Sequence, residues 1–245
     1  MRRTTRPPPR LLSDGTPLRN RLLLALPRLD YERIAGDLQL KEVAVGQMLH
    51  ERGKRIADVY FPNGGVFSVT NEMEGGELVE VATVGREGML GIGVFLGDRS
   101  GVGKTFQQVP DGLCVSMPAA RFVKATAAAG PFRHVISLYA QANLLQIMQC
   151  TACNALHDVT QRCCRWLLQT RDRVEADDFM LKQEFLAIML GVNRPTVTVV
   201  MGRLKKAGLV STRYGHMQVL DRKRLEAMSC ECYRVIERAF DRLGL

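Results

Sequence analysis

Seven cysteines are the residues whose type and spacing most directly suggest chemistry in this chain. Four of them form two close pairs, Cys150-x-x-Cys153 and Cys230-x-Cys232. Thiolates at such spacings are typical ligands of zinc and of iron–sulfur clusters, provided that the two pairs meet in the fold. Cysteine is also a common small buried residue. Two interpretations of these four cysteines therefore stay open: simple burial, or a zinc, iron–sulfur or redox site.

A second chemically active region is the strongly basic segment between residues 182 and 224. It has nine Lys and Arg residues against two acidic residues, a net charge of +7, whereas the whole chain has +9. Clustered cations are typical of surfaces that neutralise phosphates and release their counterions. The sequence therefore predicts a surface that binds a polyanion.

The elements that must position these charges are two short helices, a tight turn and a hairpin. Apolar residues at helical spacing precede Gly191, which can adopt the positive φ of a sharp turn between helices. Asn193 is a good N-cap for the second helix, and Tyr214-Gly215 is predicted to turn the hairpin. This is the pattern of a winged helix-turn-helix, whose second helix enters the major groove of DNA.

The rest of the sequence argues against an enzyme and against a membrane protein. The four histidines are scattered, and the glycine-rich stretch GREGMLGIG lacks the Lys-Ser/Thr of a phosphate-binding loop. No run approaches the roughly 18 apolar residues of a membrane span. The start, MRRTTRPPPR, has no apolar core of an export signal. We expect a cytoplasmic protein with reduced thiols that is not an enzyme.

The first half of the chain predicts a β-rich domain. Residues 1–17 are predicted to be a disordered basic arm. Residues 18–40 suggest one or two amphipathic helices, with Leu22, Leu26, Leu29 and Ile34 on the apolar side. Short β-type runs separated by glycine turns then predict a jelly roll or β-roll. The clearest runs are 58–62, 65–72, 77–84, 104–109 and 113–117.

After Pro118 the chain is predicted to be helical over 119–129, 132–156 and 159–173. In the long central helix, Leu138, Ala142, Leu145 and Gln149 recur at intervals of three or four residues. Such a seam suits pairing with a second copy, although a core helix within one subunit would show the same period. A two-fold dimer would place two recognition helices on a palindrome. We therefore predict a homodimer that pairs through this helix.

The predicted fold class is α+β, with an N-terminal jelly-roll or β-roll sensor domain, a long dimerisation helix and a C-terminal winged helix-turn-helix. The predicted domain bounds are 18–130, 131–157 and 158–245.

This order of parts, with the connector QRCCRWLLQTRDR and the helix pair QEFLAIMLGVNRPTVTVVMGRLKKAGLV, resembles the Crp/Fnr family of bacterial transcription regulators. The resemblance covers nearly the whole chain beyond residue 17. It implies a cyclic-nucleotide-binding-like sensor domain and a dimer that binds palindromic promoter sites in duplex DNA. It also implies contact with RNA polymerase.

The resemblance assigns roles in the recognition helix, which opens with Ser-Arg-Glu-Thr-Val in the family. Arg194 and Thr196 stand at matching positions, and the fork of Arg194 could read guanine O6 and N7, with a phosphate-only contact as the alternative. Pro195 replaces the usual Glu, and Val199 stands where a second base-reading Arg often lies, so the family's usual target is not expected. The predicted DNA contacts are Gln183, Asn193, Arg194, Thr196, Thr198, Arg203, Lys205 and Arg213.

The effector is less clearly indicated. Family members that bind cyclic nucleotides hold sugar and phosphate with a Gly-Glu pair and an Arg-Ser pair. Here Glu87-Gly88 reverses the first pair, and Arg99-Ser100 lies a few residues too early. A cyclic nucleotide is therefore not expected, and another small-molecule effector, or none, is left open. The candidate effector residues are Arg86, Glu87, Gly88, Arg99 and Ser100.

Three functions are compatible with these patterns. The first is a sequence-specific DNA-binding regulator. The second is a regulator that senses a metal or thiol oxidation through its cysteines. The third is a ligand-binding β-roll protein with no role on DNA. Salt-sensitive binding to duplex DNA would separate the third from the other two.

Overall fold

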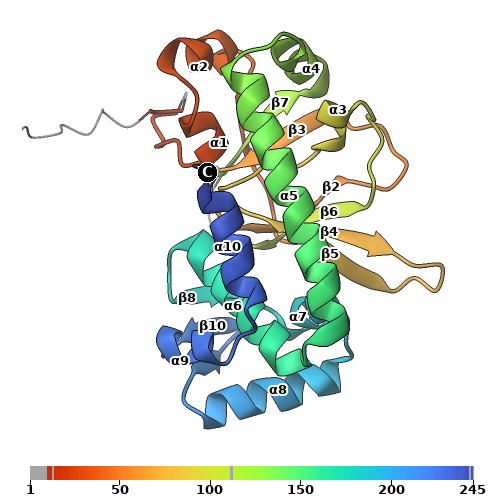
Figure 1. Ribbon diagram of the computed structural model, residues 1–245, viewed down its shortest axis with the longest axis vertical. Helices are drawn as coiled ribbons and strands as arrows, with labels where there is room; N and C mark the ends of the chain where they lie inside the picture. Colours follow the sequence, from red (N-terminus) through yellow and green to blue (C-terminus); the bar gives the residue numbers. More distant parts are fainter. Residues whose placement is uncertain (1–9, 13, 111–112, 243, 245) are drawn as a thin grey trace, which may run out of the picture.

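The computed structural model describes residues 10–12, 14–110, 113–242 and 244. Its upper half in Figure 1 is built on two antiparallel sheets, with strand orders β1-β7-β3 and β2-β6-β4-β5. The strands are β1 (Gln39–Glu42), β2 (Met48–His50), β3 (Asp58–Pro62), β4 (Val66–Glu72), β5 (Leu78–Val84), β6 (Lys104–Val109) and β7 (Leu113–Pro118).

The five predicted strands are confirmed as β3 to β7. Tyr60 and Cys114 of one sheet pack with Phe67 and Val84 of the other. Val59, Phe61 and Val115 are buried on the opposite face of their sheet, in a cluster that includes Leu22 and Phe122. β1 and β2 were not predicted, because the short segments QLKE and MLH carry too little alternation to stand out. The predicted β-roll is therefore present, and it has two more edge strands than the sequence indicated.

Short helices cover one end of the roll. They are α1 (Arg21–Leu24), α2 (Arg28–Ala35), α3 (Gly93–Leu96) and α4 (Ala119–Ala127). The predicted helical region 18–40 forms two helices, and its Leu22, Leu26 and Ile34 are buried as expected. The prediction for Leu29 is wrong, because α2 turns this side chain to solvent, where it is 68% exposed.

The predicted basic arm, residues 1–17, lies partly outside the described residues. Residues 1–9 and 13 lie outside the described residues. The Arg10 guanidinium donates to the carbonyls of Leu23 and Leu26 and lies 4.9 Å from the ring centre of Tyr31. This end of the arm is therefore held on α1 and α2 and is not disordered.

Two long helices connect the halves of the molecule. α5 (Pro131–Leu156) runs from the β-roll toward the opposite end, and α6 (Val159–Val174) returns beside it (Figure 1). Asp158 separates them, because its carboxylate accepts hydrogen bonds from the backbone N–H groups of Thr160 and Gln161 and caps α6. The predicted helices 132–156 and 159–173 are confirmed to within one residue.

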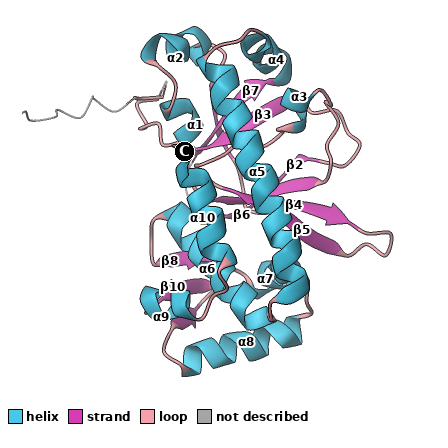
Figure 2. Ribbon diagram, viewed as in Figure 1, coloured by secondary structure: helices cyan, strands magenta, loops and turns pink. Residues whose placement is uncertain are grey.

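The C-terminal part contains the predicted winged helix-turn-helix (Figure 2). The helix pair packs on a three-stranded sheet of order β8-β10-β9, of which β8 was not predicted. These elements are α7 (Gln183–Leu190), α8 (Arg194–Lys206), β8 (Asp178–Met180), β9 (Val210–Arg213) and β10 (His216–Val219). α9 (Arg222–Ala227) and α10 (Cys232–Arg242) follow, and α10 packs along α5.

A buried ion pair joins the β-roll to the end of α6. The Arg173 guanidinium donates to Glu87 Oε1 at 2.8 Å and to Thr83 Oγ1 at 2.7 Å. It also lies 3.2 Å from Gln146 Oε1 of α5. Burial raises the pKa of Glu87, but Arg173 and backbone hydrogen bonds lower it more, so the carboxyl titrates below its ordinary range. Both groups are therefore charged at neutral pH and hold three elements together.

Among the described residues, no single helix has the length and apolar character needed to cross a membrane. Only α7 and α8 meet both criteria when taken together, and they are bent by 104°.

Candidate nucleic-acid interface and sensor sites

The predicted recognition helix is α8, which lies across the end of the molecule opposite α2 and α4 (Figure 1). Gly191 ends α7 with φ of 61°, as the predicted turn requires. The Asn193 side chain accepts a hydrogen bond from the N–H of Thr196 at 3.0 Å and caps α8. Val197, Val200 and Leu204 are buried against α7 and the wing. The opposite face of α8 is therefore directed to solvent.

The exposed face of α8 carries most of the predicted DNA-contacting residues. Arg194, Thr198 and Arg203 are exposed on it, and Lys205 follows in its last turn. The Thr196 hydroxyl donates to Asn193 Oδ1 at 2.7 Å, and the Thr198 hydroxyl donates to the Arg194 carbonyl at 3.1 Å. These two hydroxyls are therefore hydrogen-bonded within the helix.

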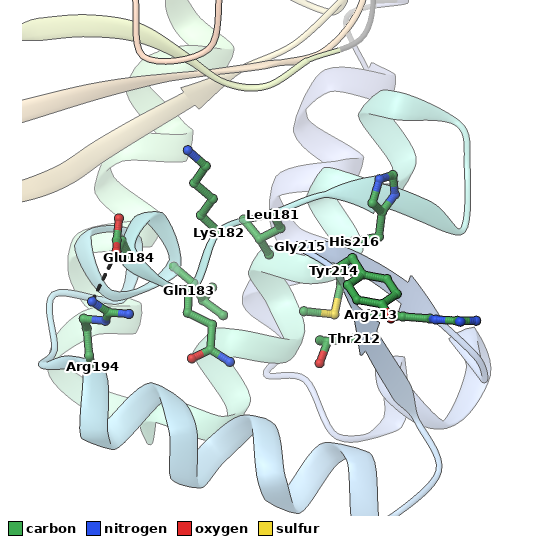
Figure 3. A pocket seen from close by; sticks show the side chains of 12 residues that line it. Leu181, Lys182, Gln183, Glu184, Arg194, Thr212, Arg213, Tyr214, Gly215 and His216 are labelled. Carbon is green, nitrogen blue, oxygen red and sulfur yellow. Dashed lines mark ion pairs between the residues drawn. The ribbon is translucent and has the colours of Figure 1, made fainter.

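A polar groove of about 360 Å³ separates the start of α7 from the wing (Figure 3). Gln183 and Arg194 line it on the helical side, and Arg213 and Tyr214 line it on the wing. Arg194 Nη1 lies 3.1 Å from Glu184 Oε1, in an ion pair whose members are both well exposed. Tyr214 and Gly215 both have positive φ, so the predicted hairpin turn is confirmed. Arg194 of α8 and Arg213 of β9 therefore line one groove from opposite sides, with Arg194 turned toward Glu184 (Figure 3).

Comparison with known proteins agrees with this geometry. A family model described as the Crp-like helix-turn-helix domain matches residues 161–228. These residues form a Crp-like helix-turn-helix domain. No curated protein sequence shows a significant match to the chain.

Solved structures extend the similarity of fold to the β-roll. A Crp/Fnr-family transcriptional regulator from Eubacterium rectale is 17% identical, with a TM-score of 0.64 over 84% of this chain and 96% of that one. A CRP-family regulator from Thermus thermophilus is 18% identical, with a TM-score of 0.65 over 78% and 96%. The c-di-GMP-responsive global regulator CLP from Xanthomonas campestris is 16% identical, with a TM-score of 0.65 over 80% and 100%. The chain therefore has the Crp/Fnr fold.

The predicted effector residues beside the Crp-like domain have structural partners. Glu87 is paired with Arg173, and Arg86 forms an ion pair with Glu175 and donates to the Arg173 carbonyl at 3.2 Å. Gly88 lies against Tyr139, where an added Cβ would come within 2.6 Å of the ring. These contacts join the β-roll to α5 and α6, and the effector role of Arg86, Glu87 and Gly88 stays a prediction.

A larger apolar cavity of about 500 Å³ lies between the β-roll and α5. Val84 and Leu90 are among its apolar walls, and Leu144 and Ile147 of α5 close one side. Of the remaining effector candidates, Ser100 lines this cavity and Arg99 does not. No Arg, Lys, Asp or Glu is among its described lining residues. The described lining of the cavity therefore offers no guanidinium or ammonium group to a phosphate.

Glu80 is a buried carboxyl where β5 meets α6. Its two oxygens accept hydrogen bonds from Ser68 Oγ at 2.8 Å and from Trp166 Nε1 at 3.2 Å. Burial raises the pKa of Glu80 to about 8, although these hydrogen bonds and nearby arginines oppose the rise. The carboxyl is therefore mostly protonated at neutral pH.

The stability of Glu80→Gln is expected to fall less than that of the wild type when the pH is raised from 6 to 9. The pKa of Glu80 is raised in the folded state, so the stability that it contributes is complete below the unfolded pKa. That stability is lost as the pH rises through about 8. The loss is at most about 1.4 kcal/mol per pH unit. Thermal unfolding at pH 6 and pH 9 should show a smaller decrease in Tm for the variant than for the wild type. Equal decreases would contradict the assignment.

The residues predicted to form the dimer seam on α5 do not coincide with the residues that are exposed on this helix. Ala142 is 1% exposed and packs inside its own subunit, so the prediction for this residue is wrong. Leu138 packs partly against the same core, and Gln149 donates to Cys232 Sγ. Leu145 lies at the edge of the exposed face, whose centre is Leu144 and Met148, 58% and 64% exposed. The helical period was readable from the sequence, whereas the side of α5 that the β-roll covers was not.

Three of the four predicted metal-ligating cysteines meet in space. Cys153 of α5 meets Cys230 and Cys232 at the start of α10, and His157 completes a group whose ligand atoms all lie within 4.8 Å. Cys150 is outside this group, and its Sγ accepts a hydrogen bond from Arg165 at 3.5 Å. The CxC segment is buried and opens a helix, so it is not a mobile tail. Sequence reasoning missed His157, although Cys153-x-x-x-His157 is the spacing of one helical turn.

Proposed function

We propose that this protein is a homodimeric, sequence-specific DNA-binding transcription regulator of the Crp/Fnr type and not an enzyme. The observation that carries the proposal is α8, a capped helix with an exposed basic face at the end of the molecule. In this proposal residues 18–130 are the sensor domain, 131–157 the dimerisation helix and 158–245 the DNA-binding domain. Two copies would bind a palindromic promoter site and contact RNA polymerase.

In this proposal, Arg194 leaves its ion pair with Glu184 and contacts a guanine when DNA binds. Its ion pair with Glu184 is exposed, so it contributes little to stability and can be replaced. The freed guanidinium would offer two parallel hydrogen bonds to guanine O6 and N7. Val199 is 54% exposed on the same face, where it could meet a thymine methyl group. The other predicted DNA contacts are Gln183, Asn193, Thr196, Thr198, Arg203, Lys205 and Arg213; the two threonines suit a phosphate or a base edge, and Gln183 suits the backbone.

The apolar cavity supports a small-molecule effector without charge. Its walls provide burial for an apolar ligand, and Ser100, Thr105 and His50 provide a few polar groups for orientation. Leu144 lies both in this wall and on the exposed face of α5. A bound ligand would therefore change the position of the helix that we propose as the dimer contact. Such a shift would move the two recognition helices relative to each other.

Arg194→Ala is expected to relax sequence preference at one base position of each half-site. Loss of a bidentate contact to guanine should cost about 1–3 kcal/mol on the preferred sequence and much less on others. Selection of bound duplexes from a random pool, followed by titration at several salt concentrations, measures this change. If Arg194→Ala weakens all sequences equally, the arginine contacts only phosphate.

Arg203→Ala is the matched control on the same face of α8. Its predicted phosphate contact should weaken all sequences alike and reduce the salt slope by about one. Failure of the wild-type protein to bind any duplex in a salt-dependent way would reject the proposed function.

A further inference from the structure

The group Cys153, His157, Cys230 and Cys232 has the geometry of a closed metal site. Cys153 Sγ and Cys230 Sγ are 3.5 Å apart, and Cys232 Sγ and His157 Nδ1 are 3.6 Å apart. Around a tetrahedral zinc ion, bond lengths of about 2.3 Å to sulfur and about 2.0 Å to nitrogen separate neighbouring ligand atoms by about 3.6–3.8 Å. Both distances therefore suit a single ion. A sulfur–sulfur distance of 3.5 Å is too long for a disulfide.

The ligands come from two segments that are far apart in sequence. Cys153 and His157 are one turn apart at the end of α5, and Cys230 and Cys232 flank the start of α10. The three sulfur-bearing side chains are at most 2% exposed. Four protein ligands would complete a tetrahedron and leave no open position, as in structural zinc sites.

His157 is held in the orientation that a ligand needs. Its Nε2 lies 3.2 Å from Glu231 Oε2, on the opposite side of the ring from the sulfurs. A proton on Nε2 that is donated to this carboxylate leaves Nδ1 with a free lone pair toward Cys232. Gln149 Nε2 also donates to Cys232 Sγ at 3.0 Å, which favours a thiolate there. These contacts therefore suit a neutral histidine that offers Nδ1 to an ion shared with Cys232.

A buried cation beside the group is an independent sign of negative charge. Arg165 of α6 is 6% exposed, and its Nε has no hydrogen-bond partner among the described residues. It forms no ion pair within the described part of the chain, and its Nη1 contacts only Gln169 Oε1 and Cys150 Sγ. Its guanidinium also lies close to Cys153. Zinc bound by three thiolates and a neutral histidine carries a net charge of −1, which would balance Arg165.

We propose that Cys153, His157, Cys230 and Cys232 bind one structural Zn²⁺ that fastens α10 to the end of α5. α10 continues from this point along α5, and its Ile236 and Phe240 enter the core of the β-roll half. The ion would therefore hold α10, which follows the winged helix-turn-helix in the chain, against α5, which precedes it. Loss of zinc would release this link, and the consequence of that release for DNA binding rests on the proposed function.

Metal analysis of the full-length protein, purified with its thiols reduced, tests the site without any DNA. We expect about one zinc per chain in the wild type and in Cys150→Ser, the matched control one turn away. Cys230→Ser and Cys232→Ser should lose the zinc. His157→Cys should keep it, and Co²⁺ substitution should give the absorption of a tetrahedral thiolate site that shifts between wild type and His157→Cys. Glu231→Gln should weaken zinc binding by about 10- to 100-fold.

The opposite results are equally clear. Reduced wild-type protein without zinc, and without affinity for added Zn²⁺ or Co²⁺, would show that the thiols are only buried. Iron with inorganic sulfide would replace the single ion by a cluster. Loss of zinc in Cys150→Ser as complete as in Cys232→Ser would show that the ligand set is wrong. The Co²⁺ spectrum of the wild type decides the question even if a cysteine variant does not fold. Failure to bind DNA would leave all these results unchanged.

Discussion

Replacing Arg173 by methionine is expected to lower the free energy of unfolding by about 3–5 kcal/mol. The guanidinium is the only charged partner of the buried Glu87 among the described residues, and it also donates to Thr83 and Gln146. The substitution would leave a carboxylate buried without its counter-ion, which costs more than the pair itself contributes. For a chain of this size, Tm should fall by roughly 6–20 °C. Denaturant unfolding and calorimetry measure both quantities.

Arg171→Met is the matched control on the same helix. Arg171 pairs with Asp172 and Asp177, but its side chain is far more exposed than that of Arg173. Its loss should cost about 0–1 kcal/mol. The double variant Glu87→Met, Arg173→Met should recover part of the loss, because neither charge is then left alone. Equal losses for Arg171→Met and Arg173→Met would show that Arg173 does not hold the two halves together.

The double substitution Leu144→Glu, Met148→Glu is expected to convert the proposed dimer into a monomer. Both side chains are exposed on the same face of α5, one turn apart, and would be buried between two copies. Each large side chain at the centre of an interface contributes about 2 kcal/mol or more, so association should weaken at least about a thousandfold. Sedimentation velocity over a range of concentrations measures the change. DNA with two half-sites should be bound correspondingly more weakly, and a single half-site much less affected.

Leu29→Glu is the control for added charge on an exposed apolar position. Leu29 lies on α2 and is as exposed as Met148, so it should leave the dimer intact. A wild-type monomer at all concentrations would reject dimerisation through α5. A dimer that survives Leu144→Glu, Met148→Glu would place the contact on another face.

The sequence was sufficient for the elements whose signals are local. Gly191, the Asn193 cap and the Tyr214-Gly215 turn each depend on the conformation of one or two residues, and each was predicted at its place. The strands β3 to β7 were readable because β-branched and apolar residues are concentrated in short runs between glycine turns, although most of these strands are buried along nearly their whole length. Short polar segments such as β1 carry no such run and were missed.

Only the tertiary structure shows which surfaces of the helices and strands pack against one another. Period alone shows that α5 has an apolar face, but the β-roll covers the side with Ala142 and leaves Leu144 and Met148 exposed. The pairing of Glu87 with Arg173, 86 residues later in the chain, is likewise visible only in the fold. His157 likewise joined the cysteines only when α10 packed on α5, which brings together residues 77 positions apart. Local propensity acts within a few residues of the chain, whereas such pairings depend on which buried faces fit one another.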